Sequence, residues 1–147
     1  MAATGRRYAQ AAFELAKEHD SLDEWEEGLT RASEVLADPD VLNFLYAPQV
    51  TDKAKLDGIA TLLPSIDVLV RNTISLMTVN HDVTKFVQMY RLFGEMVDEY
   101  RGIARADVIT AVPLGDAQRD RLALGLASMV GRSEVKITEN VNPEIIG

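Results

Sequence analysis

The stretch RGIARADVITAV, residues 101–112, contains the change in hydrophobic spacing that decides the fold. Upstream of it, apolar side chains recur every three or four positions. Within it, apolar side chains alternate with Arg105 and Asp107. The first spacing is typical of amphipathic helices and the second of half-buried strands. We therefore predict two domains, residues 1–102 and residues 103–147.

The first part of the chain shows helical spacing in six segments. Pro39 and Pro64 mark boundaries, because proline fits the first turn of a helix but not its interior. The pattern from Ser21 to Glu24 predicts a capping box, and Ser65 is the predicted cap of the fifth helix. Short connections favour a compact six-helix bundle. The predicted helices start at about Arg6, Leu22, Pro39, Asp52, Ile66 and Val83.

The second part of the chain reads as strand, helix and strand. Pro113 ends the first strand, Asp116 is the predicted cap of the helix, and Gly131 ends that helix. Val135 and Ile137 then restore the period of two. A crossover of this kind makes its two strands parallel. The predicted class is therefore mainly α, with a six-helix bundle followed by a small, incomplete α/β unit. Two strands and one helix bury little apolar surface, so this unit is expected to be only marginally stable by itself.

Composition limits the classes of protein to consider. The chain has 147 residues, of which 47% are hydrophobic and 26% are charged, as in an ordinary globular protein. Its 15 Lys and Arg against 23 Asp and Glu give a formal charge of -8. That balance argues against nucleic acid as the main partner, because phosphate binding needs a basic face. Without cysteine, thiolate catalysis and Cys-based zinc sites are excluded.

Candidate catalytic and metal-binding residues form no coherent set. His19 and His81 each precede an aspartate, but neighbours on a helix point about 100° apart and make no ligand pair. The acidic run at residues 23–27 lies in a predicted first turn, where negative charge complements the helix dipole. No phosphate-binding glycine loop is present in the sequence. We therefore predict no catalytic residue, no metal site and no cofactor, and hence no enzyme.

The first predicted helix has a wide apolar surface of mostly small side chains. Such a surface lets another helix approach closely. One interpretation is that every one of these residues packs inside the bundle. The other is that they form a groove for the amphipathic helix of a partner. The residues concerned are Tyr8, Ala9, Ala11, Ala12, Leu15 and Ala16.

Three stretches of the sequence resemble one family in the same order. RRYAQAAFELAKEHDSLDEW, residues 6–25, resembles the start of the delta subunit of the bacterial F-type ATP synthase, the counterpart of the mitochondrial oligomycin-sensitivity-conferring protein. ADVITAVPL, residues 106–114, is similar to the strand and Pro-Leu turn after its helical domain. VKITENVNPEIIG, residues 135–147, is similar to the segment that leads into its Gly-Gly motif. The resemblance extends over essentially the whole chain.

The resemblance implies a non-catalytic connector in the peripheral stalk, or stator, at the cytoplasmic face of the cell membrane. In the family, the first and fifth helices hold the N-terminal helix of an alpha subunit of the catalytic head. The C-terminal part joins the C-terminal helices of the b subunits, so membrane association occurs only through the complex. This linkage couples proton flow to ATP synthesis. The partner-binding positions carried onto this chain are Tyr8, Ala11, Ala12, Leu15, Leu76, Val79 and Asn80.

This sequence differs from the family pattern in two places. Family members often have a basic Gly-Arg-like step after the fifth helix, where this chain has residues 80–83, Asn-His-Asp-Val. The polar contact at that end of the groove is therefore left open. The family also continues with a second glycine and further strand, so we expect a longer chain to extend beyond Gly147. The alternative function is a helical-bundle RNA-binding antitermination module, against which the acidic balance counts.

Overall fold

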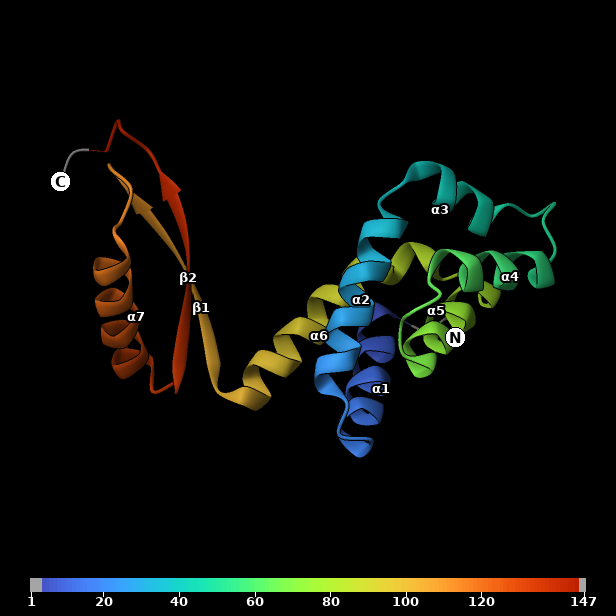
Figure 1. Ribbon diagram of the computed structural model, residues 1–147, viewed down its shortest axis with the longest axis horizontal. Helices are drawn as coiled ribbons and strands as arrows, with labels where there is room; N and C mark the ends of the chain where they lie inside the picture. Colours follow the sequence, from blue (N-terminus) through green and yellow to red (C-terminus); the bar gives the residue numbers. More distant parts are fainter. Residues whose placement is uncertain (1–3, 146–147) are drawn as a thin grey trace. The chain divides into compact units, whose positions relative to one another are not determined.

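The computed structural model describes residues 4–145. The chain divides between Met96 and Val97 into two compact units, an N-terminal one and a C-terminal one (Figure 1). The division falls within the last long helix of the N-terminal part. The predicted division into domains at residue 102 stays a prediction.

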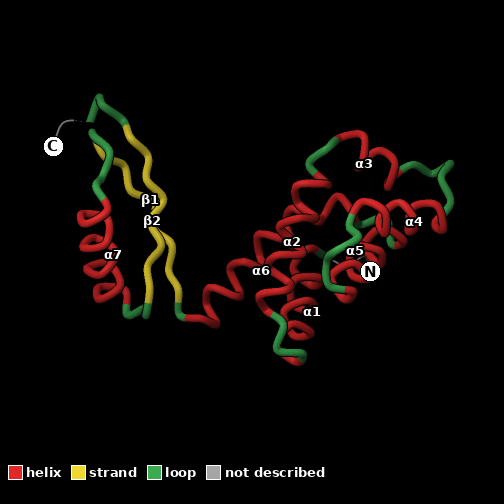
Figure 2. Tube along the Cα trace, in the orientation of Figure 1, coloured by secondary structure: helices red, strands yellow, loops and turns green. Residues whose placement is uncertain are grey.

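The N-terminal unit is built from helices, as Figure 2 shows. Six α-helices follow the predicted order, and a short 3-10 turn precedes the sixth. This arrangement confirms the expected bundle. The elements are α1 (Gly5–Glu18), α2 (Leu22–Leu36), α3 (Pro39–Tyr46), α4 (Asp52–Leu62), α5 (Val68–Val79), η1 (Val83–Lys85) and α6 (Phe86–Arg101).

Two of the predicted helix caps in the N-terminal unit are wrong. Ser21 precedes α2, but its hydroxyl makes no cap bond and instead donates to the carbonyl of Ala16, at 3.5 Å, at the end of α1. Its ψ of 31° is also outside the extended range of a typical cap. Helix α5 is capped by Asp67 rather than Ser65, since the Asp67 carboxylate accepts from the backbone N–H of Leu69 at 2.8 Å.

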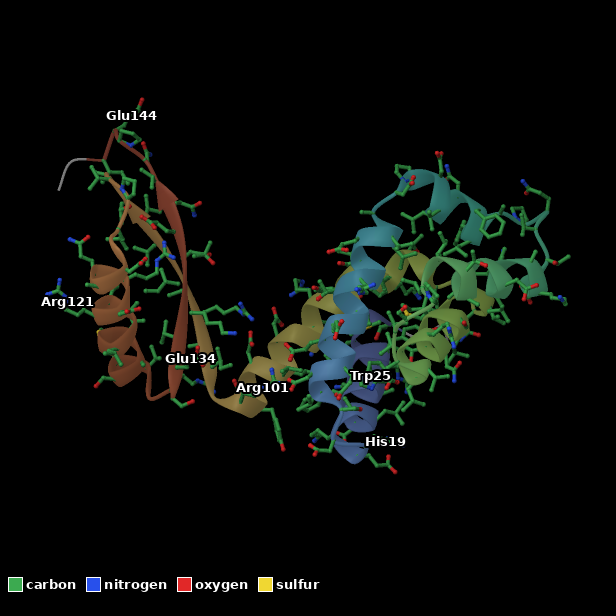
Figure 3. The ribbon with its side chains drawn as sticks, viewed as in Figure 1. His19, Trp25, Arg101, Arg121, Glu134 and Glu144 are labelled. Atoms are coloured by element: carbon green, nitrogen blue, oxygen red, sulfur yellow. The ribbon has the colours of Figure 1, made fainter. Side chains whose placement is uncertain are left out.

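The core of the N-terminal unit is centred on the single tryptophan. Trp25 is fully buried, and Figure 3 shows it inside the bundle. Its ring stacks on Phe93 at a centroid distance of 6.0 Å, and Phe13 meets Phe93 edge to face at 6.4 Å. The indole N–H of Trp25 is buried and has no hydrogen-bond partner among residues 4–145. The ring contacts therefore hold a side chain that carries an unsatisfied donor.

The C-terminal unit has the predicted strand, helix and strand. Strand β1 (Ile103–Thr110) and strand β2 (Glu134–Val141) pair in parallel, with α7 (Asp116–Val130) between them in sequence. The helix lies along the strand pair, and Arg121 points away from the strands (Figure 3). Gly131 ends α7 in the left-handed conformation at φ 69°, as predicted. The residue at the cap position of α7 is Gly115, so the prediction of Asp116 as the cap is wrong.

Glu139 ties strand β2 to the start of α7. One carboxylate oxygen accepts from the backbone N–H of Leu114, at 2.5 Å, and the other from the guanidinium of Arg119, also at 2.5 Å. The Leu114 N–H and then Arg119 lower the pKa of Glu139 from its ordinary value of 4.5. A carboxylate held in this way favours the folded state only while it is ionised.

We expect Glu139→Gln to loosen the C-terminal unit at neutral pH, because the neutral amide accepts weaker bonds. In the wild type the contribution of Glu139 is present above its unfolded pKa and is lost as pH falls through the lowered folded pKa. Hydrogen-exchange protection of the β1 and β2 amides, corrected for intrinsic rates, measures both effects. Glu144→Gln is the matched control. Equal protection in the two variants would contradict the assignment.

Candidate partner-binding site

The four predicted positions on α1 divide into a buried pair and a surface pair. Tyr8 is 6% exposed and Ala12 is 1% exposed, so both pack inside the bundle. Ala11 is exposed and Leu15 is partly exposed. The two interpretations of the small-residue surface therefore each describe part of α1. Only Ala11 and Leu15 are open to a partner.

The three predicted positions near the end of α5 are all exposed. Leu76 is 53% exposed and Val79 is 38% exposed, although both are apolar. Asn80 follows them at the C-terminal cap of α5 and is exposed as well. The inward face of α5 is formed instead by other side chains. The buried residues of this helix are Val70, Ile74, Met77 and Thr78.

The structure brings the two sets of predicted residues together at one end of each helix. Helices α1 and α5 pack against each other. The side-chain amide of Asn80 donates to the hydroxyl oxygen of Tyr8 at 3.1 Å. Ala11 lies about one helical turn from Tyr8, and Leu76 lies about one turn from Asn80. The exposed apolar residues of α1 and α5 thus flank a direct contact between the helices.

A polar residue outside the predicted set completes this contact. The Tyr8 hydroxyl donates to Asp82 at 2.6 Å, and both groups are buried. The other carboxylate oxygen of Asp82 pairs with Lys85 at 2.8 Å. The structure thus places a carboxylate in the segment where the family pattern is basic, and the polar contact with a partner at that end of the groove stays a prediction.

The turn after α5 places this carboxylate. His81 has a φ of 60°, in the left-handed region, which turns the chain sharply. The backbone N–H of Asp82 then bonds to the carbonyl of Met77 at 2.7 Å. This reversal directs Asp82 back toward α1. In sequence, the one signal for it was the spacing from Asp82 to Lys85, which suits an ion pair.

The electrostatics of this cluster favour an ionised Asp82. Hydrogen bonds from Lys85 and then from Tyr8 lower the pKa of Asp82 from its ordinary value of 3.8. Burial, followed by the bond to Asp82, raises the pKa of Tyr8. At neutral pH the cluster therefore contains a carboxylate, an ammonium and a neutral phenol. In these states the carboxylate accepts both hydrogen bonds, the ammonium donates one, and the phenol donates one and accepts one.

Tyr8→Phe should lower the free energy of unfolding by about 1–3 kcal/mol, since a buried bond to a charged acceptor is lost. The depressed pKa of Asp82 means that the stabilisation is present above its unfolded pKa and disappears as pH falls through the folded value. Urea unfolding followed by the fluorescence of Trp25 measures the change. Tyr46→Phe is the control, because the Tyr46 hydroxyl forms no hydrogen bond within residues 4–145. Equal effects of the two changes would contradict a special role for Tyr8.

Other features of the N-terminal unit lie apart from the predicted positions. The ring of His19 is 3.0 Å from the carbonyl of Leu15 at the end of α1, and His81 meets the ring of Tyr46 edge to face. Both histidines therefore have structural contacts.

A hollow of about 260 Å³ between α2 and α6 is mostly apolar. It is lined by Ser33, Leu36, Ala37, Phe86, Val87, Tyr90 and Arg91.

Known proteins are similar to this chain in sequence. The family described as ATP synthase delta (OSCP) subunit matches residues 4–147. An ATP synthase subunit delta from Alcanivorax borkumensis is 33% identical over 143 residues, covering 97% of this chain and 80% of that protein. One from Desulfitobacterium hafniense is 34% identical over 147 residues, covering 99% and 82%.

A solved structure shares the fold. A chain in the structure of the Toxoplasma gondii mitochondrial ATP synthase hexamer has a TM-score of 0.74 to this chain at 19% identity, covering 97% of this chain and 80% of that one. The fold of this chain is thus also found in a mitochondrial ATP synthase assembly. The chain belongs to the ATP synthase delta (OSCP) subunit family. The resemblance drawn from the sequence is confirmed.

Proposed function

We propose that this chain is a non-catalytic connector in the peripheral stalk of a rotary ATP synthase. Its α1 and α5 surface binds the N-terminal helix of an alpha subunit, and its C-terminal unit binds the C-terminal helices of the b subunits. At the cytoplasmic face of the membrane, this linkage holds the catalytic head against rotation. Proton flow is thereby coupled to ATP synthesis.

One observation carries the first half of this proposal. Leu76 and Val79, which are 53% and 38% exposed, lie on α5 within about one turn of its contact with Tyr8 on α1. Exposed Ala11 adds a small residue on the opposite helix. An apolar strip with a small residue at its edge suits a helix that lays its apolar face between two others.

Apolar burial supplies much of the free energy that a stator contact needs, but not all of it once the ordering costs are subtracted. Burying about 600 Å² of apolar surface contributes about 15 kcal/mol before ordering costs. A nanomolar complex requires about 12 kcal/mol. The contact therefore needs good packing on both helices, together with a favourable polar contribution at its ends. Slow dissociation then follows from the depth of the contact rather than from any chemistry.

The C-terminal unit has its own candidate surface for helices. No residue of α7 is buried, and three of its large apolar residues are exposed, one in the middle of the helix and two at its end. Leu124 is 73% exposed, Met129 is 82% exposed and Val130 is 56% exposed. At about 100° per residue these three side chains point to different sides of α7, so they form no single stripe, but exposed large apolar side chains of this kind suit burial by a partner. We assign this surface to the b-subunit helices.

The linkage is tested with the partners from the same organism. Isothermal titration of the 147-residue chain with a peptide copying the first twenty or so residues of the alpha subunit should give a saturable complex. Leu76→Asp should abolish it, whereas Leu124→Asp should not. Conversely, Leu124→Asp should reduce co-purification with the b subunits and leave the peptide affinity unchanged. Binding of the peptide to the Leu76→Asp variant at wild-type strength would refute the α5 assignment.

The RNA-binding alternative draws no support from the structure. The family match extends over residues 4–147, and the predicted partner surface is apolar rather than basic. Nucleic-acid recognition relies on clustered Lys and Arg.

Among residues 4–145, no helix is long and apolar enough to cross a membrane. We therefore assign membrane attachment to the partner subunits.

A further inference from the structure

Four side chains form a continuous hydrogen-bonded row at the end of the α1 and α5 surface. Lys85 pairs with one oxygen of Asp82, and the other oxygen accepts from Tyr8. The oxygen of Tyr8 in turn accepts from Asn80. The row runs from the half-buried Lys85 through the buried Asp82 and Tyr8 to an exposed amide. Each bond in it constrains the next.

The ion pair fixes the direction of every bond in the row. An ionised carboxylate can only accept, so the hydroxyl hydrogen of Tyr8 must go to Asp82. The Tyr8 oxygen then has only acceptor capacity left, and Asn80 must present its NH₂ group to it. The carbonyl oxygen of Asn80 therefore points the other way. It forms no hydrogen bond with any part of the chain that the structure describes.

We propose that Asp82 is a positioning residue: acting through Tyr8, it fixes the Asn80 amide so that its carbonyl oxygen accepts a hydrogen bond from the partner helix. This inference rests on the proposed function of the α1 and α5 surface. Asn80 supplies one acceptor beside the exposed apolar residues Leu76 and Val79. The partner must bring an N–H donor to this end, either from the free backbone N–H groups of a helix N-terminus or from a basic side chain.

Replacing Asp82 by asparagine reverses the row. Lys85 can only donate, so it takes the single oxygen of the new amide and leaves the NH₂ group facing Tyr8. Tyr8 must then accept from residue 82 and donate to Asn80. The Asn80 amide turns over and presents its NH₂ group outward. A donor would then meet the donor of the partner.

The orientation of the amide is tested in the free protein. In the ¹⁵N-labelled 147-residue chain, the side-chain NH₂ signals of Asn80 should show one hydrogen protected from exchange. Asp82→Asn and Tyr8→Phe should both remove this protection. Asn43, an exposed residue on α3, is the internal control. Equal exchange of the Asn80 and Asn43 side chains in the wild type would overturn the inference without affecting the proposed function.

The effect on the partner is tested by a double-mutant cycle with the alpha-subunit peptide. Asp82→Asn and Asn80→Ala should each weaken binding about tenfold, the equivalent of one hydrogen bond. If Asp82 acts through Asn80, the double variant should bind no more weakly than Asn80→Ala alone. Thermal unfolding of each variant shows that it is folded at the temperature of the titration. Additive losses would show that Asp82 acts independently, and would overturn the inference.

The remaining outcomes separate this inference from the proposed function. A wild-type chain that does not bind the peptide, but protects the Asn80 amide, overturns the proposed function and the partner role of Asn80 together. A wild-type chain that binds the peptide, with no loss in Asp82→Asn, overturns only the inference. A second peptide, with every Lys and Arg replaced by Met, identifies the donor. A retained effect of Asp82→Asn excludes a Lys or Arg side chain as the donor, and a lost effect indicates one.

Discussion

Ala11→Asp should weaken binding of the alpha-subunit peptide more than about a hundredfold, or about 2.7 kcal/mol. Ala11 is exposed beside the contact between α1 and α5, so a partner helix would bury an aspartate placed there. A buried carboxylate without a cation loses its hydration and gains little in return. The fold itself should be retained, because an exposed aspartate in a helix costs well under 1 kcal/mol relative to alanine. Isothermal titration measures the loss.

Ala12→Asp is the control for this prediction. The two residues are neighbours in the same helix, but Ala12 is 1% exposed and packs inside the bundle. The same substitution one position later should therefore unfold the N-terminal unit rather than only block the partner. Circular dichroism distinguishes the two results. A folded Ala12→Asp variant, or a fully binding Ala11→Asp variant, would show that the faces of α1 are assigned wrongly.

Trp25→Ala should lower the free energy of unfolding of the N-terminal unit by about 3–5 kcal/mol. Trp25 is fully buried and stacks on Phe93, which also meets Phe13. Removing the indole leaves a cavity that Phe93, itself held against Phe13, cannot fill. Since small domains are stable by only about 5–15 kcal/mol, this is a large fraction of the total. Urea unfolding followed by circular dichroism measures it.

Trp25→Phe should cost no more than about 1 kcal/mol. Phenylalanine keeps the ring contact with Phe93 and loses some volume, but it also removes the buried N–H that has no partner. The gain from removing that donor offsets part of the lost packing. A cost close to that of Trp25→Ala would mean that the indole N–H has a partner, such as a bound water.

Local periodicity was enough to predict the elements of this fold. Hydrophobic spacing depends on which side chains face the core, and it can be recognised within a short stretch of sequence. This applies to the helical spacing of the six segments and to the alternation around Arg105 and Asp107. The glycine end of α7 at Gly131 follows an equally local rule. Ser21 and Ser65 were assigned wrongly because several polar residues near a helix start compete for the cap position.

The candidate site could be predicted only in part. The exposed apolar residues Leu76 and Val79 follow from the family resemblance, which nothing in periodicity alone would single out. Asp82 was missed because its partner Tyr8 lies 74 positions away in sequence. That contact depends on the left-handed turn at His81, and no local pattern fixes such a turn. Long-range polar contacts of this kind require the three-dimensional structure.

The parallel pairing of β1 and β2 has a mechanical consequence. The chain enters β1 at Ile103 and leaves β2 at Val141, and the register pairs Ile103 with Glu134 and Thr110 with Val141. These two points are therefore at opposite ends of the strand pair. A pulling force applied between them acts along the strands, in shear. The hydrogen bonds of the ladder then share the force and must break together, whereas bonds peeled from one end break singly.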